Sequence, residues 1–326
     1  MNDTASPLLD PSEVEAIDLF SAARVRTLLH GEHASVFTGT RGGDFSGIRD
    51  FEPGDPLASI DWAHSATKRF SPLMVRERVE ERSIDIVIVA DISASTRCGV
   101  PDALIGKSIA RTIATIGFSA SLFQDMVGLV LFGGTEQTVE PPRGGRNHVA
   151  RMVDLYQAAP AAPAHPGNGR LADAVAAELR RTSLVVVASD FLFPGVWCTL
   201  SDLADLKQPH DLFLVMADSA FAYGLPGISA GWIGCMDSET GRYVCLSHSE
   251  IRDLPGRIRR YQDAVADYAE RSGLEVFRAL PDAEEFQSAI IDFFLERRLR
   301  LGAGDRGRMG ELNAQEHRAH AADVVR

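Results

Sequence analysis

Three oxygen-bearing side chains follow a run of apolar residues in the stretch "IDIVIVADISAS": Asp91, Ser93 and Ser95. A loop that turns directly after a strand can direct residues i, i+2 and i+4 at one centre. One carboxylate and two hydroxyls are oxygen donors, which hard divalent cations prefer. Their low total charge leaves a bound ion electrophilic and able to keep water or to accept a carboxylate from a partner. The spacing therefore indicates a divalent-cation site.

A second carboxylate is placed to complete this site. Asp190 follows the apolar run "SLVVVAS", as Asp218 follows "HDLFLVMA". In parallel sheets the ligand site lies beyond the carboxyl ends of the strands. We therefore predict a metal site of Asp91, Ser93, Ser95 and Asp190. Mg²⁺ is the first choice because it tolerates retained waters, with Mn²⁺ and Ca²⁺ as alternatives. A second interpretation stays open, in which Asp91 and Ser93 only cap the following helix.

Apolar strands alternate with amphipathic helices along the chain. This alternation predicts an α/β fold with a mainly parallel sheet and helices on both faces. We expect two strands within residues 71–91 and further strands at 126–132, 183–190, 210–218 and 273–279, with a hairpin within 231–247. The 3.6-residue period predicts helices at 13–30, 102–124, 146–158, 169–181, 199–208, 250–271 and 282–299.

The same patterns divide the chain into four segments. Residues 1–12 are expected to be a flexible lead, and residues 13–82 an N-terminal segment rich in Gly, Asp, Ser and aromatic residues after its first helix. Residues 83–300 form the α/β domain. Residues 301–326 contain few large apolar side chains, so we expect a mobile tail.

Composition excludes some classes of protein. The net charge of −12 argues against binding nucleic acid through a basic surface. The four cysteines form no CxxC pair and indicate reduced, intracellular thiols. The N-terminus lacks the pattern of a signal peptide, and the apolar runs are too short to span a bilayer. We expect a cytoplasmic protein without a membrane span.

Two stretches, "DISAS" and "VVVASD", resemble the metal-ion-dependent adhesion site (MIDAS) of von Willebrand factor A domains. Longer stretches resemble an uncharacterised bacterial von Willebrand A-like family associated with MoxR-type AAA+ ATPases. They are "GGDFSGIRDFEPGDPLASIDWAHSATKR", "LPGISAGWIGCMDSETGRY" and "DFFLERR", and the resemblance covers residues 15–300. It implies a von Willebrand A-like fold and a non-enzymatic protein-binding module. Such a module would act as an adaptor between a MoxR-type ATPase and a client protein, and we expect no catalytic residue.

The block "RDFEPGDPLASIDW" allows two interpretations. In the structural one, Gly54 and Asp55 form a turn, Trp62 anchors a core, and Arg49 pairs with Asp55 or Asp61. In the functional one, Arg49, Asp55 and Asp61 organise a loop that contacts the ATPase.

This chain departs from the family pattern at several positions. Asp44, Phe51 and Ser59 stand where the family has Glu, Tyr and Arg. The adhesion-site pattern also has a Thr where this chain has Gly169, which lacks a hydroxyl; only Asn168 beside it offers a side-chain oxygen. A site without that oxygen is expected to bind its metal with modest affinity.

Two other classes of function remain open. One is an α/β hydrolase or phosphotransfer enzyme that uses Asp91 as nucleophile or Mg²⁺ ligand. A phosphotransferase of that type would require a second Asp at position 93, where this chain has Ser93. The other is a scaffold whose metal site has decayed, which the missing Thr hydroxyl at Gly169 favours.

Overall fold

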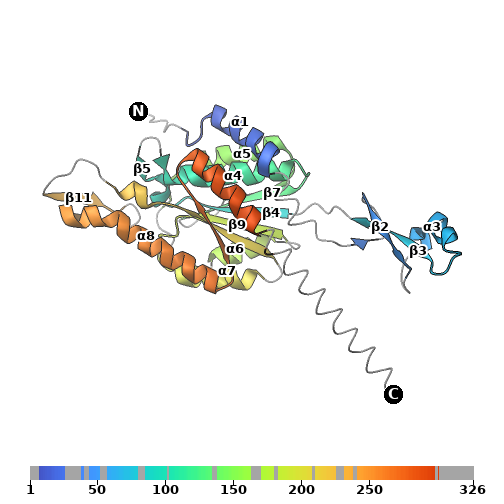
Figure 1. The fold of residues 1–326 in the computed structure, drawn as a ribbon. Helices are drawn as coiled ribbons and strands as arrows, with labels where there is room; N and C mark the ends of the chain where they lie inside the picture. The colour runs from blue at the N-terminus through green and yellow to red at the C-terminus, as the bar shows by residue number, and fades with distance from the viewer. Residues whose placement is uncertain are drawn as a thin grey trace, which may run out of the picture. The chain divides into compact units, whose positions relative to one another are not determined.

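The chain forms two compact units, one of residues 1–29 with 84–326 and one of residues 30–83. A computed structural model (Figure 1) describes residues 7–25, 38–39, 44–51, 57–79, 85–100, 103–133, 138–162, 170–179, 183–207, 210–224, 231–237, 241–297 and 300. The predicted tail, residues 301–326, lies outside these described residues.

A six-stranded sheet forms the centre of the larger unit, in the order β13-β10-β9-β4-β7-β8. Every neighbouring pair is parallel except β7 and β8. When the six strands are renumbered in chain order, with β4 as 1 and β13 as 6, the spatial order is 6-5-4-1-2-3. This order is typical of doubly wound α/β folds. The predicted fold class, a von Willebrand A-like α/β fold with a mainly parallel sheet, is confirmed. The strands are β4 (Asp85–Asp91), β7 (Met126–Phe132), β8 (Thr138–Arg143), β9 (Ser183–Ser189), β10 (Asp211–Ala217) and β13 (Glu275–Ala279).

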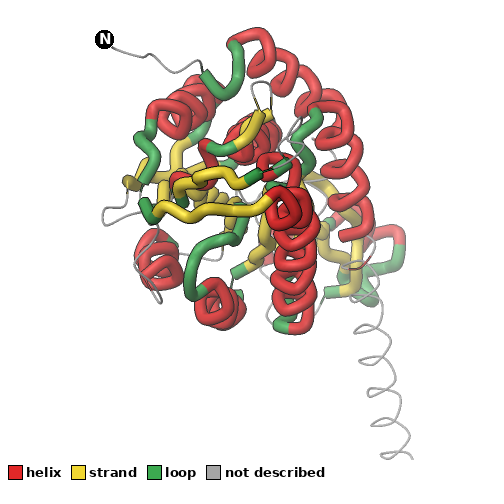
Figure 2. The backbone as a smooth tube through the Cα atoms, turned by 90° about the vertical axis from the view of Figure 1, so that its left-hand side faces the viewer, coloured by secondary structure: helices red, strands yellow, loops and turns green. Residues whose placement is uncertain are grey.

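Helices cover both faces of this sheet (Figures 1 and 2). One core joins α1 (Pro11–Phe20), α4 (Ile105–Ser121), α5 (Arg146–Ala158) and the helical residues 283–297 to one face. The other joins α6 (Arg170–Glu178), α7 (Val196–Leu206) and α8 (His248–Arg271) to the opposite face. Successive residues of a strand point to opposite faces, so Ile86 and Ile88 enter the first core and Val87 and Val89 the second. Burial on both faces explains the long apolar runs of the four inner strands β4, β7, β9 and β10.

One strand of the sheet was not expected. β8 has the sequence "TVEPPR" and lies at the edge, antiparallel to β7. Its two prolines are typical of a loop, so no strand was predicted there. An edge strand tolerates Pro because one side of its backbone needs no partner. The predicted hairpin is present as β11 (Trp232–Met236) paired with β12 (Tyr243–Ser247). None of the helices in the described part of the chain is long and apolar enough to cross a membrane.

The N-terminal helix belongs to the larger unit. We expected a flexible lead to residue 12 and a separate segment over 13–82, but Leu9 and Ile17 are buried in the core with α4. Glu13 also pairs with Arg111 (2.8 Å) and Lys107 (3.1 Å) of α4. The boundary therefore falls after the first helix, because that helix buries its apolar face on the sheet domain.

The smaller unit has a three-stranded antiparallel sheet in the order β1-β3-β2, with a short helix α3. The prediction of Trp62 as a core anchor is wrong, because this side chain is 59% exposed at the first position of α3. Among the described residues of this unit, Ile60, Met74 and Val75 are buried apolar side chains. The elements are β1 (Thr38–Gly39), β2 (Asp44–Asp50), the 3-10 turn Leu57–Ser59, α3 (Trp62–Thr67) and β3 (Met74–Val79).

Candidate metal centre

The candidate site lies where the sheet changes winding direction. β4 is followed by α4, which packs on one face, whereas α6, which precedes β9, packs on the other. Because β4 and β9 are adjacent and parallel, their carboxyl ends open a crevice at this switch point. Asp91 is the last residue of β4, and Asp190 follows the last residue of β9. The structure therefore brings both predicted carboxylates to the edge where α/β folds bind ligands.

Asp91 is 1% exposed and held by hydrogen bonds on both carboxylate oxygens. Oδ1 accepts from the backbone N–H of Ser93 (2.7 Å), which tightens the turn after the strand. Oδ2 accepts from the hydroxyl of Ser189 (2.5 Å). The main-chain oxygen of Asp91 accepts from the buried hydroxyl of Tyr156 (3.1 Å). Ser189 of β9 thus helps to fix the orientation of the Asp91 carboxylate, and Tyr156 of α5 fixes the main chain of Asp91.

The two hydroxyls of the triplet lie together. The Oγ atoms of Ser93 and Ser95 are 3.0 Å apart, and both residues are buried. Ser93 precedes the 3-10 turn Ala94–Arg97, but its side chain makes no capping hydrogen bond there. Instead, the hydroxyl of Thr96 donates to the main-chain oxygen of Ser93 (2.7 Å). The interpretation of Ser93 as a side-chain cap is therefore wrong, and its hydroxyl is turned to that of Ser95.

Asp190 is 1% exposed, and its Oδ1 accepts from the N–H of Leu192 (3.0 Å). Its main-chain oxygen accepts from Nε2 of Gln262, a fully buried side chain of α8 (3.0 Å). The same Nε2 donates to the main-chain oxygen of Ala217 (2.9 Å). Gln262 thus ties the carboxyl ends of β9 and β10 to α8 and fixes the backbone that carries Asp190.

The electrostatics favour a cation. Burial and, second, the negative charge of Asp190 raise the pKa of Asp91 from 3.8 to about 7, although hydrogen bonds from Ser189 and Ser93 lower it. Two buried carboxylates that repel each other are costly unless a positive charge offsets them. Among the described residues, no three His, Cys, Asp or Glu side chains cluster as metal ligands. The donor set is therefore two carboxylates with hydroxyls, which fits Mg²⁺ better than a softer ion.

Of the other residues predicted from the sequence, Asp55, Asn168 and Gly169 are outside the described residues. Arg49 and Asp61 belong to the smaller unit, where Arg49 donates to the main-chain oxygen of Asp50 (3.0 Å). Asp61 is buried and caps α3 by accepting from the N–H of His64 (3.0 Å).

Sequence reasoning missed the residues that position the site. Ser189 carried one available signal, since it is a polar residue at the end of the apolar run before Asp190. Tyr156 and Gln262 lie in helices far along the chain and carried none.

Fold and site together define a von Willebrand A-like domain with a candidate metal centre at the switch point of its sheet. The chain belongs to the family described as "Protein of unknown function DUF58", whose model matches residues 47–267. It is 28% identical over 231 residues to the uncharacterised protein Rv1480 of Mycobacterium tuberculosis (strain H37Rv), which is 70% of each chain.

Two solved structures are similar in fold at low sequence identity. BatB, a conserved hypothetical protein from Bacteroides thetaiotaomicron, aligns with a TM-score of 0.42 and 13% identity over 67% of this chain and 100% of its own. The SpRpn10 VWA domain aligns with a TM-score of 0.36 and 11% identity over 64% of this chain and 94% of its own.

Proposed function

We propose that this chain is a non-enzymatic, metal-dependent protein-binding module. The observation that carries the proposal is the burial of Asp91 and Asp190 at the switch point, with the hydroxyls of Ser93 and Ser95 beside them. Two carboxylates and two hydroxyls supply four side-chain ligands, fewer than the six of octahedral Mg²⁺, which leaves positions for water and for one further oxygen ligand.

Each residue has a distinct part in this proposal. Asp91 and Asp190 supply the charge that attracts the ion, and Ser93 and Ser95 supply neutral oxygens. Mg²⁺, when bound, provides an electrophilic centre to which a partner's carboxylate can bind. Ser189 and the N–H of Ser93 keep the Asp91 carboxylate in place, and Gln262 does the same for the backbone at Asp190. Preorganisation of this kind reduces the ordering cost of binding.

The proposed partner is a MoxR-type AAA+ ATPase, with this chain as its adaptor in the assembly, activation or metal loading of a client protein. The sequence resemblance supports this partner. Arg49, Asp55 and Asp61 of the smaller unit would organise the loop that contacts the ATPase, and the buried Asp61 also caps α3.

Two alternatives make different demands on the same residues. An enzyme that uses Asp91 as nucleophile needs a substrate beside the carboxylate that Ser93 and Ser189 hold in place, and it would show turnover that a binding module does not. A scaffold with a decayed site needs no metal, and the absence of a Thr hydroxyl at position 169 is the feature that favours it.

Co-purification with the ATPase tests the proposal. The tagged full-length chain is mixed with the purified MoxR-type ATPase of the same organism, in Mg²⁺ or in EDTA. We expect retention in Mg²⁺, loss in EDTA, and loss in Asp91→Asn. Asp218→Asn is the matched control, because Asp218 also follows a strand of this sheet and its Oδ1 accepts a backbone N–H, that of Ala220 (3.0 Å). Retention that is equal in Mg²⁺ and EDTA would contradict metal dependence.

A further inference from the structure

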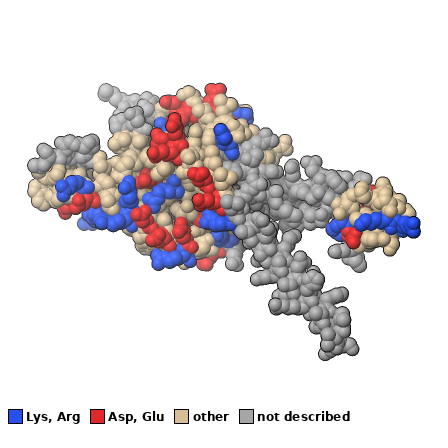
Figure 3. All heavy atoms as spheres, viewed as in Figure 1, with Lys and Arg blue, Asp and Glu red and all other residues tan. Residues whose placement is uncertain are grey.

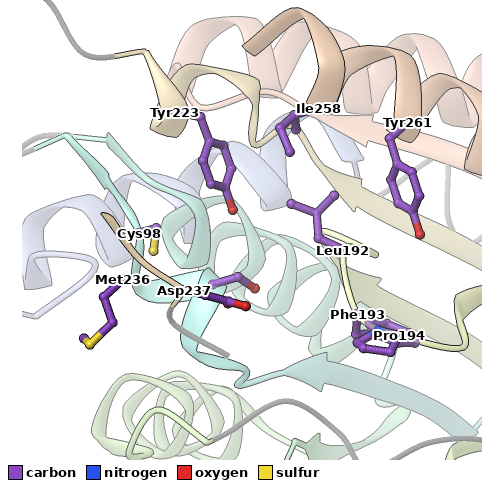
Figure 4. A pocket seen from close by; sticks show the side chains of 10 residues that line it. Cys98, Leu192, Phe193, Pro194, Tyr223, Met236, Asp237, Ile258 and Tyr261 are labelled. Carbon is purple, nitrogen blue, oxygen red and sulfur yellow. The ribbon is translucent and has the colours of Figure 1, made fainter. Parts of the chain in front are cut away.

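A cavity of about 510 Å³ opens beside the candidate metal centre (Figure 4). Part of its wall comes from the two loops that carry the metal ligands. Ser95 and Cys98 contribute from the segment after β4, and Leu192 and Phe193 from the loop after Asp190. Ser95 therefore belongs both to the hydroxyl pair of the metal centre and to the wall of the cavity.

The rest of the wall is mostly apolar. Figure 4 shows Leu192, Tyr223 and Ile258 converging on the cavity from three different elements, with Met236 at its edge. The volume is in the range of small-molecule and side-chain pockets, about 300–1,000 Å³. It has room for a bulky aliphatic or aromatic side chain.

An exposed apolar face continues from the cavity along the hairpin. Met236 pairs with Tyr243 across β11 and β12, so the two side chains share one face, with Trp232 four pairs away on the same side. Met236 is 59%, Tyr243 81% and Trp232 73% exposed. Exposed large apolar side chains grouped on one face mark interaction surfaces.

One acidic side chain, Asp237, lines the cavity, and a basic segment follows it along the chain. Residues 242–261 contain five arginines and two acidic residues. Ile258 and Tyr261 of α8 line the cavity, and Arg257 and Arg260 each precede one of them by one position, about 100° around the helix. Basic side chains gather over the N-terminal half of α8 in Figure 3. This surface is complementary to an acidic partner.

We propose that the cavity receives a bulky apolar side chain that lies within a few residues of the partner's metal-binding carboxylate, in an acidic protein segment. The inference rests on the proposed function, because the carboxylate is the one that completes the metal centre. Ser95 joins the two subsites, the arginines of α8 attract further acidic residues of the segment, and the hairpin face extends its apolar contact.

Selection from a random peptide library tests this proposal. The full-length chain is immobilised in Mg²⁺, panned against phage-displayed dodecapeptides, and eluted with EDTA. We expect enrichment of peptides with an acidic residue and a large apolar residue close together, within a net acidic sequence. Synthetic peptides of the enriched sequence should bind about tenfold more weakly when the apolar residue is changed to Ala, about 1.4 kcal/mol.

Variants of the chain separate the two subsites. Ile258→Gln should remove the apolar preference and keep the acidic one. Leu295→Gln, at an exposed helical position outside the cavity wall, should change neither. Acidic peptides without an apolar preference, or an unchanged preference in Ile258→Gln, would overturn the cavity proposal and leave the metal-dependent module standing. Peptides that stay bound in EDTA, or no enrichment at all, would overturn both.

Discussion

Replacing Asp190 by Asn should change stability in opposite directions with and without metal. The substitution removes one charge of the buried carboxylate pair and keeps a side-chain oxygen that can accept from the N–H of Leu192. Without metal, the repulsion on Asp91 is relieved and the protein should become more stable. With metal, a charged ligand is lost and stabilisation by the ion should disappear.

The size of the effect follows from the pKa of Asp91. Its rise from 3.8 to about 7 corresponds to roughly 4 kcal/mol at 1.36 kcal/mol per unit. Burial is the largest cause of this rise and the charge of Asp190 comes second, so relief of the repulsion should recover only part of this energy. Because the folded pKa is raised, the stability that this group contributes is present below pH 4 and is lost as the pH rises through 7. The gain in the free energy of unfolding that Asp190→Asn brings in the absence of metal should therefore be small near pH 5 and complete above pH 7.

Thermal unfolding in EDTA at about pH 5 and about pH 8 measures this directly, since ~1 kcal/mol shifts the Tm by about 2–4 °C in a domain of this size. Added Mg²⁺ should stabilise the wild type by about 2.7 kcal/mol when it reaches ~100 times its Kd, and the variant by nothing. Asp218→Asn is again the control. The reasoning is refuted when Asp190→Asn is less stable than the wild type in EDTA at the higher pH, or when it keeps the full response to Mg²⁺.

Three further predictions concern the hydroxyls of the site, a buried arginine at the other end of the strands, and the absence of catalysis. Ser93→Ala and Ser189→Ala should each weaken Mn²⁺ binding in a titration by about fivefold, less than the loss in Asp91→Ala, because a hydroxyl contributes only a dipole or a supporting hydrogen bond worth ~1 kcal/mol; an unchanged affinity in both would remove these hydroxyls from the site. Arg297 is fully buried and pairs with Asp211 and Glu275, which are partly exposed, so Arg297→Ala should cost about 1–3 kcal/mol in chemical denaturation because the two carboxylates lose this partner; an unchanged stability would contradict this. Purified protein with Mg²⁺ should not hydrolyse nucleotides or generic esters, and turnover that vanishes in Asp91→Ala would point to an enzyme.

The sheet and the triplet could be predicted because their signals are local. Uninterrupted apolar runs predict the inner strands. One of these runs ends directly before Asp91, and Ser93 and Ser95 lie two and four residues further on. The position of Asp190 followed from one further step, namely that adjacent parallel strands end at the same edge. β8 was missed for the opposite reason, since its two prolines are typical of a loop and only its edge position makes them acceptable.

Other features depend on contacts between distant parts of the chain. The bond from Ser189 to Asp91 spans 98 residues, that from Tyr156 to Asp91 spans 65, and that from Gln262 to Asp190 spans 72. Side-chain types alone do not indicate which distant backbone they meet. The first helix was assigned to the wrong unit for a similar reason, because only the structure shows that Ile17 packs against α4.

Direct titration of Mn²⁺ into the metal-free, full-length chain tests the central claim, that Asp91 and its neighbours hold a divalent cation. Calorimetry or electron paramagnetic resonance follows the free and bound ion. The account predicts saturable binding of a single ion in the wild type, unchanged in Asp218→Asn and weakened at least about a hundredfold in Asp91→Asn, a loss of ~2.7 kcal/mol. No binding at millimolar Mn²⁺, or equal affinity in wild type and Asp91→Asn, would contradict it.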